Sequence, residues 1–189
     1  MKLISLDNLK AFIEKTDNQH DAILTLIVEQ VSQRLETALN RKLSKAARTE
    51  KFNGGRQRYY VSAYPIDLAQ PLTVSVEGTT KTKDVDYWVE EESGLIEFWL
   101  ETVYSKPMGV SVVYTGGYAV DGTTSVVAVP DDLKRACYMQ CAFDFKRRKD
   151  LGLNSVTMPD GSVSVESPAE LLPEVKAIIK SQRKFPGIR

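Results

Sequence analysis

Apolar positions between residues 21 and 39 repeat with the period of an α-helix. Spacings of one, three and four residues separate Ile23, Leu24, Ile27, Val28, Val31, Leu35, Ala38 and Leu39. Such spacing gives a helix one broad apolar face. Polar residues that water can solvate fill the opposite face. We therefore expect a helix from Asp21 to Leu39, about 28 Å long at ~1.5 Å per residue, as the central element of the fold.

Three further helices are expected around it. The first runs from Leu6 to Lys15, with Ser5 as its N-cap. A second, from Asp131 to Lys149, has apolar residues in almost every direction around its axis, which indicates burial on all sides and a neighbouring subunit that covers part of it. In the last helix, Pro173 is expected to mark the start or a kink. The apolar stripe of this helix consists of Leu171, Leu172, Val175, Ile178 and Ile179.

Between about 48 and 115 the period changes from 3.6 to 2, which is typical of strands. The expected strands are Thr49–Phe52, Tyr59–Val61, Leu72–Val76, Tyr87–Glu90, Leu95–Leu100 and Val110–Tyr114. The turn residues Asn53, Gly54 and Gly55 favour a hairpin that joins the first two strands.

These elements predict an α+β protein with a single domain over residues 1–189. A bundle of three to four helices (helical core about 5–43 and 130–150) holds an inserted antiparallel β region (about 48–115). An extended C-terminal arm and helix follow, at about 151–189. In this arm Val163 and Val165 are candidates for an edge strand that pairs within the chain or across a subunit boundary.

The composition favours a soluble globular protein with no membrane span. Of 189 residues, 26% are charged and 42% apolar, an ordinary balance, and no apolar run approaches ~18 residues. Asp7 interrupts the first apolar run, so we expect no secretory signal. Lys plus Arg and Asp plus Glu both number 25, and this zero net charge argues against a dedicated nucleic-acid binder.

Catalytic and metal-binding motifs are not found, so we expect no enzyme, no cofactor and no metal. The single histidine, His20, has no nucleophile motif beside it, and a hydrolase would need a pocket around it. Cys137 and Cys141 lie four residues apart in one expected helix, which favours two core side chains in a reducing compartment over a disulfide or metal site. Neither glycine pair is followed by the Lys-Ser or Lys-Thr of a phosphate loop.

Two basic groups allow two interpretations. Lys146, Arg147, Arg148 and Lys149 end the third expected helix, where the helix dipole favours cations. They are also suited to contact with a phosphate backbone or an acidic partner. The second group consists of Lys180, Arg183, Lys184 and Arg189 in the C-terminal tail. Together the two groups support the alternative function of a small nucleic-acid-binding module.

The order of several motifs resembles the head–tail connector family (adaptor or head-completion proteins) of long-tailed bacteriophages and prophages. The motifs are LISLDNLKAFI, HDAILTLIVEQVSQRLETALNRKL, FNGG, DYWVEEESGLIEF, VSVVYTGGY and VPDDLKRACYMQCAFDF, which together cover about residues 1–149. The last forty residues match only loosely.

This resemblance implies a structural virion protein of the capsid–tail neck, assembled in the bacterial host cytoplasm. Family members form a homo-oligomeric ring, typically a dodecamer, beneath the portal protein. The ring extends the DNA channel, offers a surface to the next neck or tail protein, and lets packaged DNA pass without sequence-specific binding.

Two sets of residues are candidates for contacts in such a ring. For portal docking they are Leu171, Leu172, Val175, Ile178, Ile179, Arg183 and Lys184. For the DNA channel or another partner they are Lys146, Arg147, Arg148 and Lys149. The alternative for the last helix is that it packs back on its own domain.

Overall fold

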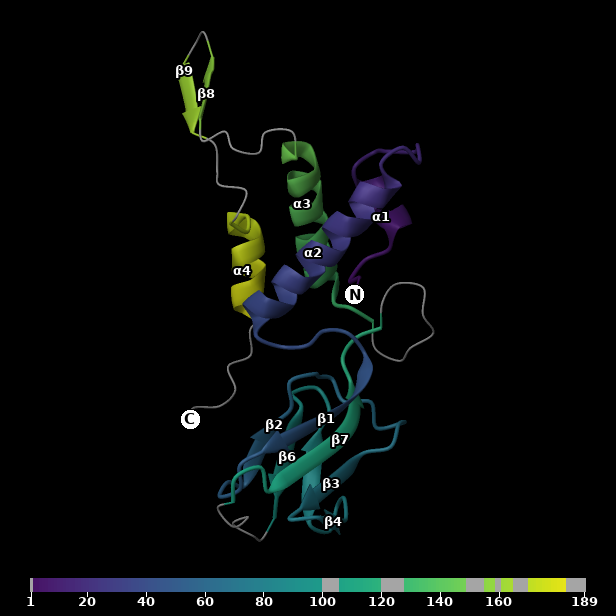
Figure 1. The fold of residues 1–189 in the computed structure, drawn as a ribbon, viewed down its shortest axis with the longest axis vertical. Coiled ribbons are helices and arrows are strands. Elements are labelled where there is room, and N and C mark those ends of the chain that lie inside the picture. The colour runs from purple at the N-terminus through teal and green to yellow at the C-terminus, as the bar shows by residue number, and fades with distance from the viewer. Residues whose placement is uncertain are drawn as a thin grey trace. The chain divides into compact units, whose positions relative to one another are not determined.

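The computed structural model describes residues 2–99, 106–119, 128–148, 155–158, 161–164 and 170–182. These residues divide into two compact units. The helical unit contains the described residues up to Leu39 and those from Pro130 onward, and the β unit contains those from Asn40 to Val129. The chain therefore leaves the helical unit after one helix pair and returns to it to complete the helical core (Figure 1). The α+β class is confirmed.

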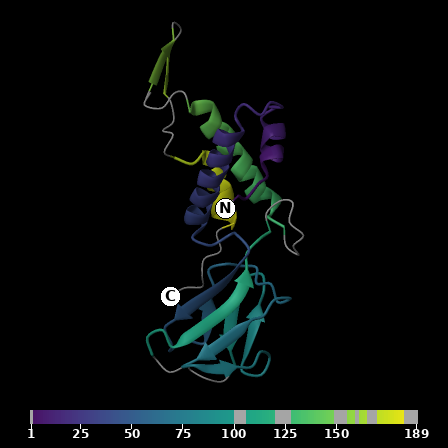
Figure 2. The same cartoon turned by 45° about the vertical axis from the view of Figure 1, so that its right-hand side comes forward.

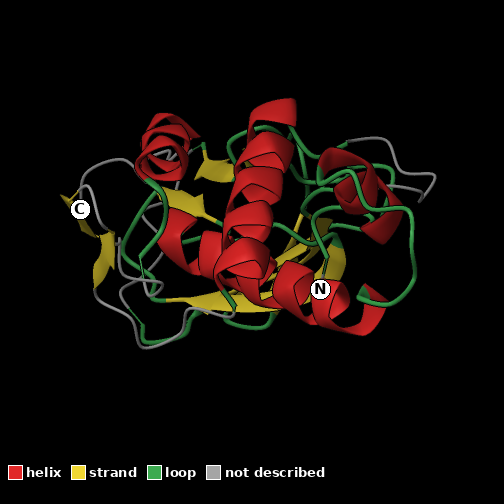
Figure 3. Ribbon diagram, turned by 90° about the horizontal axis from the view of Figure 1, so that it is seen from above, coloured by secondary structure: helices red, strands yellow, loops and turns green. Residues whose placement is uncertain are grey.

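The helical unit contains α1 (Leu6–Phe12), α2 (Asp21–Leu39), α3 (Asp131–Arg147) and α4 (Pro173–Gln182) among the described residues (Figure 3, helices in red). The bounds of α2 are the predicted ones. Ser5 caps α1, because its Oγ accepts a hydrogen bond from the Asn8 amide at 3.2 Å. The predicted end of α1 at Lys15 is wrong. The helix stops at Phe12, and Glu14 adopts a left-handed conformation with φ 56°.

The core of the helical unit lies where α2, α3 and α4 meet. Its fully buried side chains include Leu24, Val31 and Leu35 of α2. From α3 and α4 the core receives Leu133, Ala136, Cys137, Cys141 and Val175. Other residues of α3 are less covered: Tyr138, Met139, Ala142 and Phe143 are half-buried, and Asp131 and Asp132 at its start are exposed. The chain itself thus buries one face of α3, and burial on all sides would need a second molecule.

Among its described residues, the β unit contains seven strands: β1 (Ala46–Phe52), β2 (Arg58–Tyr60), β3 (Thr73–Val76), β4 (Thr79–Lys81), β5 (Tyr87–Glu90), β6 (Leu95–Phe98) and β7 (Val110–Gly116). They make a four-stranded sheet in the order β1-β7-β3-β4 and a three-stranded sheet in the order β2-β6-β5, both antiparallel. Figure 2 shows β1 and β7 side by side. One hydrophobic cluster, with Val74, Tyr87, Ile96, Val112 and Tyr114 at its centre, joins strands of both sheets.

The predicted hairpin at Asn53–Gly55 is wrong, because the two strands that flank it belong to different sheets. β1 pairs with β7 over its whole length, and β2 pairs with β6. The turn residues bind a distant loop instead. Gly54 donates its amide proton to the Lys106 carbonyl at 2.9 Å, and Met108 donates to the Asn53 Oδ1 at 3.1 Å. The sequence also gave no indication of β4.

In the C-terminal arm, β8 (Ser155–Met158) and β9 (Gly161–Ser164) form an antiparallel hairpin in which Val156 is the partner of Val163. Val163 therefore pairs within its own chain, whereas Val165 lies outside the described residues. Among the helices that the structure describes, none has the length and apolar content needed to cross a membrane.

Candidate assembly interface

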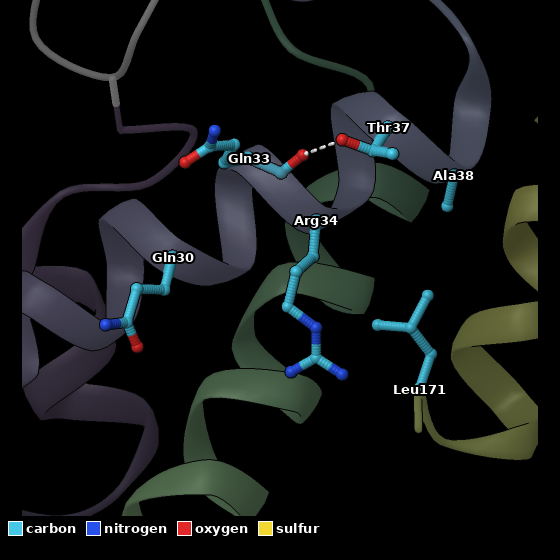
Figure 4. Close-up of a pocket in the computed structure, with 6 residues that line it drawn as sticks. All are labelled: Gln30, Gln33, Arg34, Thr37, Ala38 and Leu171. Atoms are coloured by element: carbon cyan, nitrogen blue, oxygen red, sulfur yellow. Dashed lines mark hydrogen bonds between the residues drawn. The ribbon is translucent and has the colours of Figure 1, made fainter. Parts of the chain in front are cut away.

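Two adjacent hollows lie on the surface of the helical unit, along α2. The larger, about 620 Å³, is lined by Gln30, Gln33, Arg34, Thr37, Ala38 and Leu171 (Figure 4). The smaller, about 370 Å³, is lined by Ile23, Leu26, Ile27, Gln30, Arg34, Asp144, Arg147 and Arg148. Because the two hollows share Gln30 and Arg34, we treat them as one groove. It lies between α2, α3 and the segment that precedes α4, and we call it the α2–α3 groove.

Apolar side chains of α2 that do not enter the core line one wall of this groove. Leu26 is 56% exposed and Ile23 is 36% exposed. The sequence pattern placed Ile23 on the buried face, which is wrong: it lies at the edge of the stripe, and the described part of the chain leaves it partly exposed. An open groove with large apolar side chains is typical of a surface that binds a partner.

A chain of hydrogen bonds extends from the groove into the helical core and joins α2, α3 and the segment before α4. Arg34 of α2 donates to Asp144 of α3 at 3.1 Å, and Gln140 donates to the other carboxylate oxygen of Asp144 at 2.8 Å. The Oε1 of Gln140 accepts the Leu172 amide proton at 3.0 Å. Burial raises the pKa of Asp144, against the opposite effects of the Gln140 hydrogen bond and the Arg34 charge. This network attaches the start of α4 to α2 and α3.

The second wall carries part of the basic group predicted at the end of α3. Arg148 lies with its guanidinium 3.8 Å from the centre of the Phe145 ring, and it donates to the Phe145 carbonyl oxygen. The guanidinium of Arg147 lies 5.5 Å from the Phe143 ring. Lys146 is exposed and does not line the groove, and Lys149 lies outside the described residues. The structure thus brings two of the four predicted residues together.

The predicted portal-docking stripe lies mainly against its own unit. Val175 and Ile179 are buried, at 0% and 7% exposure, where α4 packs on α2 and α3. Leu171, Leu172 and Ile178 are half-buried. Arg183 and Lys184 are outside the described residues. The packing alternative for α4 is therefore the observed arrangement, and docking of the entire stripe on a partner would require α4 to leave its unit.

The two cysteines are buried in the helical core, and His20 is half-buried. Cys137 and Cys141 are buried free cysteines with their Sγ atoms 3.9 Å apart. The contact with Cys137 and the burial of the site raise the pKa of the Cys141 thiol. His20 meets the ring of Phe145 edge-on at 5.5 Å. The described part of the chain contains no group of three His, Cys, Asp or Glu residues suited to a metal ion.

Exposed aromatic and apolar side chains occur also in the β unit. Trp99, Val85 and Met108 are 59%, 70% and 63% exposed. They lie in loops: Trp99 follows β6 and donates its amide proton to the Asp86 carbonyl at 3.1 Å, and Met108 precedes β7. The sequence pattern placed Trp99 in the expected strand Leu95–Leu100, which is wrong, because β6 ends at Phe98. It did not single out Val85 or Met108, because exposed loop positions follow no periodic rule.

A buried arginine lies at the start of the β unit, just after α2. Arg41 is 7% exposed and lies between two aromatic rings, 3.9 Å from Tyr64 and 5.0 Å from Tyr118. It also donates to the Tyr64 carbonyl at 3.3 Å. These contacts assign it a structural role in holding the two connecting segments of the β unit together.

One family model and several solved structures match this chain. The model of a family described as head completion protein matches residues 2–185. A chain in the structure titled "Neck of empty GTA particle computed with C6 symmetry" is 15% identical with a TM-score of 0.64, over 98% of this chain and 92% of that one. A chain in "Virion of native gene transfer agent (GTA) particle" is 16% identical with a TM-score of 0.65, over the same shares.

A third chain, in "Neck of native GTA particle computed with C12 symmetry", is 14% identical with a TM-score of 0.52, over 98% of this chain and 93% of that one. At these identities the likeness is one of fold. Among curated proteins, no match was found.

Proposed function

The chain belongs to the head completion protein family, and from this membership we propose that it is a structural protein of the virion neck. In this proposal copies of the chain form a ring beneath the portal protein, extend the DNA channel, and present a surface to the next neck or tail protein. The observation that carries the proposal is the family match over residues 2–185, which includes both the helical and the β unit.

The geometry of the helical unit supports an assembly role. An open groove with exposed Leu26 and Ile23, and a third helix with a half-buried face, are surfaces that a neighbouring molecule would cover. The β unit offers further exposed side chains, Trp99 and Met108, of types enriched at protein interfaces. In our proposal these surfaces contact other neck components.

The charge of the protein fits a DNA conduit. A wall with a large excess of Lys and Arg would retain DNA through phosphate contacts, whereas this chain has a net charge of zero. Arg34, the arginine at the centre of the groove, is already paired with Asp144 at 3.1 Å. DNA would therefore pass the ring without tight binding.

The test is removal of the gene in a host that produces the particle, followed by electron microscopy of the products. We expect heads that carry a portal but no tail, and we expect purified protein to restore tail joining when it is added to them. Normal tailed particles without the protein would refute the proposal.

A DNA-retention assay separates this function from the alternative of a nucleic-acid-binding module. A ring component in its monomeric form should elute from immobilised DNA at low salt. A nucleic-acid-binding module should be retained at low salt and released as salt increases, because each phosphate contact releases counterions.

A further inference from the structure

The helical unit carries two unlike surfaces that complement each other, and we propose that they bind one another between adjacent copies of the chain. In this proposal the α2–α3 groove of one copy receives the exposed face of α1 from the next. The inference rests on the proposed function, since it assumes a ring, and it adds the identity of the contacting surfaces.

The exposed face of α1 is defined by its burial pattern. Asp7, Asn8, Ala11 and Phe12 are exposed, whereas Leu9 is buried against the unit. Phe12 is 50% exposed and its ring stacks on Tyr138 with centroids 5.4 Å apart. The ring is therefore held in place by α3 while half of its surface remains free, which suits an aromatic anchor in an interface.

The two surfaces differ in charge. Three arginines (Arg34, Arg147 and Arg148) and one carboxylate (Asp144) line the smaller hollow of the groove, which leaves an excess of two positive charges. On and just after α1, the exposed charged residues are Asp7, Glu14, Asp17 and Lys15, an excess of two negative charges. Opposite charge on two surfaces steers their encounter and fixes their orientation.

A lysine that would cancel the acidic character of α1 is turned inward. Lys10 is 9% exposed and pairs with Asp21 at 2.9 Å and with Asn18 at 2.6 Å. The positive charge of this helix is therefore used inside the unit, and the outer face keeps its carboxylates. Figure 1 shows α1 and α4 on different sides of α3, so one copy can present its α1 face and its groove to two different neighbours.

The apolar parts also match. Leu26 and Ile23 provide an open apolar wall beside the groove, and the hollow of about 370 Å³ is within the ~300–1,000 Å³ range of sites that enclose small ligands. An aromatic ring such as Phe12 fits such a space. Contact would remove from water the most exposed apolar side chains of the helical unit's described part, Leu26 and Phe12.

Symmetry favours a second copy as the occupant. A contact between two unlike surfaces is heterologous, and its repetition gives a ring when the rotation between copies closes and an open filament when it does not. Two of the structures that share this fold are titled as necks computed with C6 and C12 symmetry. In cyclic arrangements of this order, adjacent copies meet through unlike surfaces, which the α1 face and the groove provide.

Thiol cross-linking in assembled particles tests the proposal. The variants Ala11→Cys and Gln30→Cys place one thiol on the α1 face and one in the groove, both at exposed positions. The native Cys137 and Cys141 are 0% exposed and should not react. With a short bismaleimide, we expect the double variant to give a ladder of linked chains, and a mixture of the two single variants to give dimers only.

The cross-linking experiment has one control and several outcomes that would refute the proposed contact. The mixture of Gln30→Cys with Thr80→Cys, an exposed position in β4, should give no dimer. Self-linking of either single variant would refute the proposal, because it would show a two-fold contact. Linking of Gln30→Cys to the portal protein, or no linking in particles that contain the protein, would also refute it. Particles that contain the protein but show either of these outcomes would still support the proposed function. Absence of the protein from particles would refute the function itself.

Discussion

The backbone amide of Leu172 donates a hydrogen bond to the side-chain oxygen of Gln140 at 3.0 Å, across the contact between α3 and α4. Gln140 is 0% exposed, and its amide group donates in turn to Asp144 at 2.8 Å. One fully buried polar side chain thus joins the first residues before α4 to the ion pair of Asp144 with Arg34. Both of its polar ends have partners, as a buried amide requires.

We predict that Gln140→Leu destabilises the protein by about 1–3 kcal/mol, because it leaves the Leu172 amide and one Asp144 oxygen without their partner. Urea unfolding measures the loss, and hydrogen exchange should show faster opening of α4 than of α2. Gln33→Leu, at an exposed position of α2, is the matched control and should change stability little. Equal stability of the Gln140 variant and the parent would contradict the role of this network.

Deletion of residues 173–189 tests the packing of α4. The helix buries Val175 and Ile179, and burial of each is worth ~1.5–3 kcal/mol, so roughly 3–6 kcal/mol should be lost together. Thermal unfolding of the full chain and the truncated chain gives this difference. Deletion of residues 183–189 alone is the control. A truncated protein that keeps its melting temperature but fails to bind portal particles would instead support α4 as a detachable docking element.

Phe143→Asp distinguishes surface from core on α3. Phe143 is half-buried, so we expect a loss of under about 2 kcal/mol in the isolated protein but strongly impaired incorporation into particles, where a neighbour would cover this face. Phe145 is 6% exposed, and Phe145→Asp should cost at least ~3 kcal/mol in the isolated protein. Normal incorporation of the Phe143 variant would show that this face of α3 stays in water.

Asp67 provides a pH-dependent contribution to the stability of the β unit. The hydrogen bond from Lys45, at 2.7 Å between Nζ and Oδ2, lowers the pKa of Asp67 below its ordinary value of 3.8. A carboxyl group with a lowered folded-state pKa stabilises the fold fully above its unfolded-state pKa. Its contribution is lost as the pH falls through the folded-state value.

We therefore predict that Asp67→Asn reduces stability by up to about 1 kcal/mol at pH 7, and that this difference from the parent shrinks as the pH falls below the ordinary pKa of 3.8. Urea unfolding as a function of pH measures it. Lys45→Met is the matched variant, and the double variant should lose no more than either single one, because both changes remove the same contact. A difference that did not shrink with falling pH would show that the ion pair is not its cause.

The sequence by itself determined the elements whose cause is local. The bounds of α2 follow from its 3.6-residue apolar period, the start of α4 follows from Pro173, and the cap of α1 follows from Ser5. Burial of Cys137 and Cys141 also follows from their place on an apolar face. The family could be identified from the order of motifs, since it depends on the succession of elements and not on their packing.

Only the tertiary structure decided which strands pair and which apolar side chains remain in water. A local rule assigned a hairpin to Asn53–Gly55, but β1 joins β7, whose Val110 and Val112 complete the buried cluster of the β unit. The same holds for the groove. Leu26 and Phe12 have the character of core residues, and they are exposed because the surrounding helices cover other faces. Periodicity shows that a face is apolar, whereas its exposure depends on distant segments whose docking no local pattern encodes.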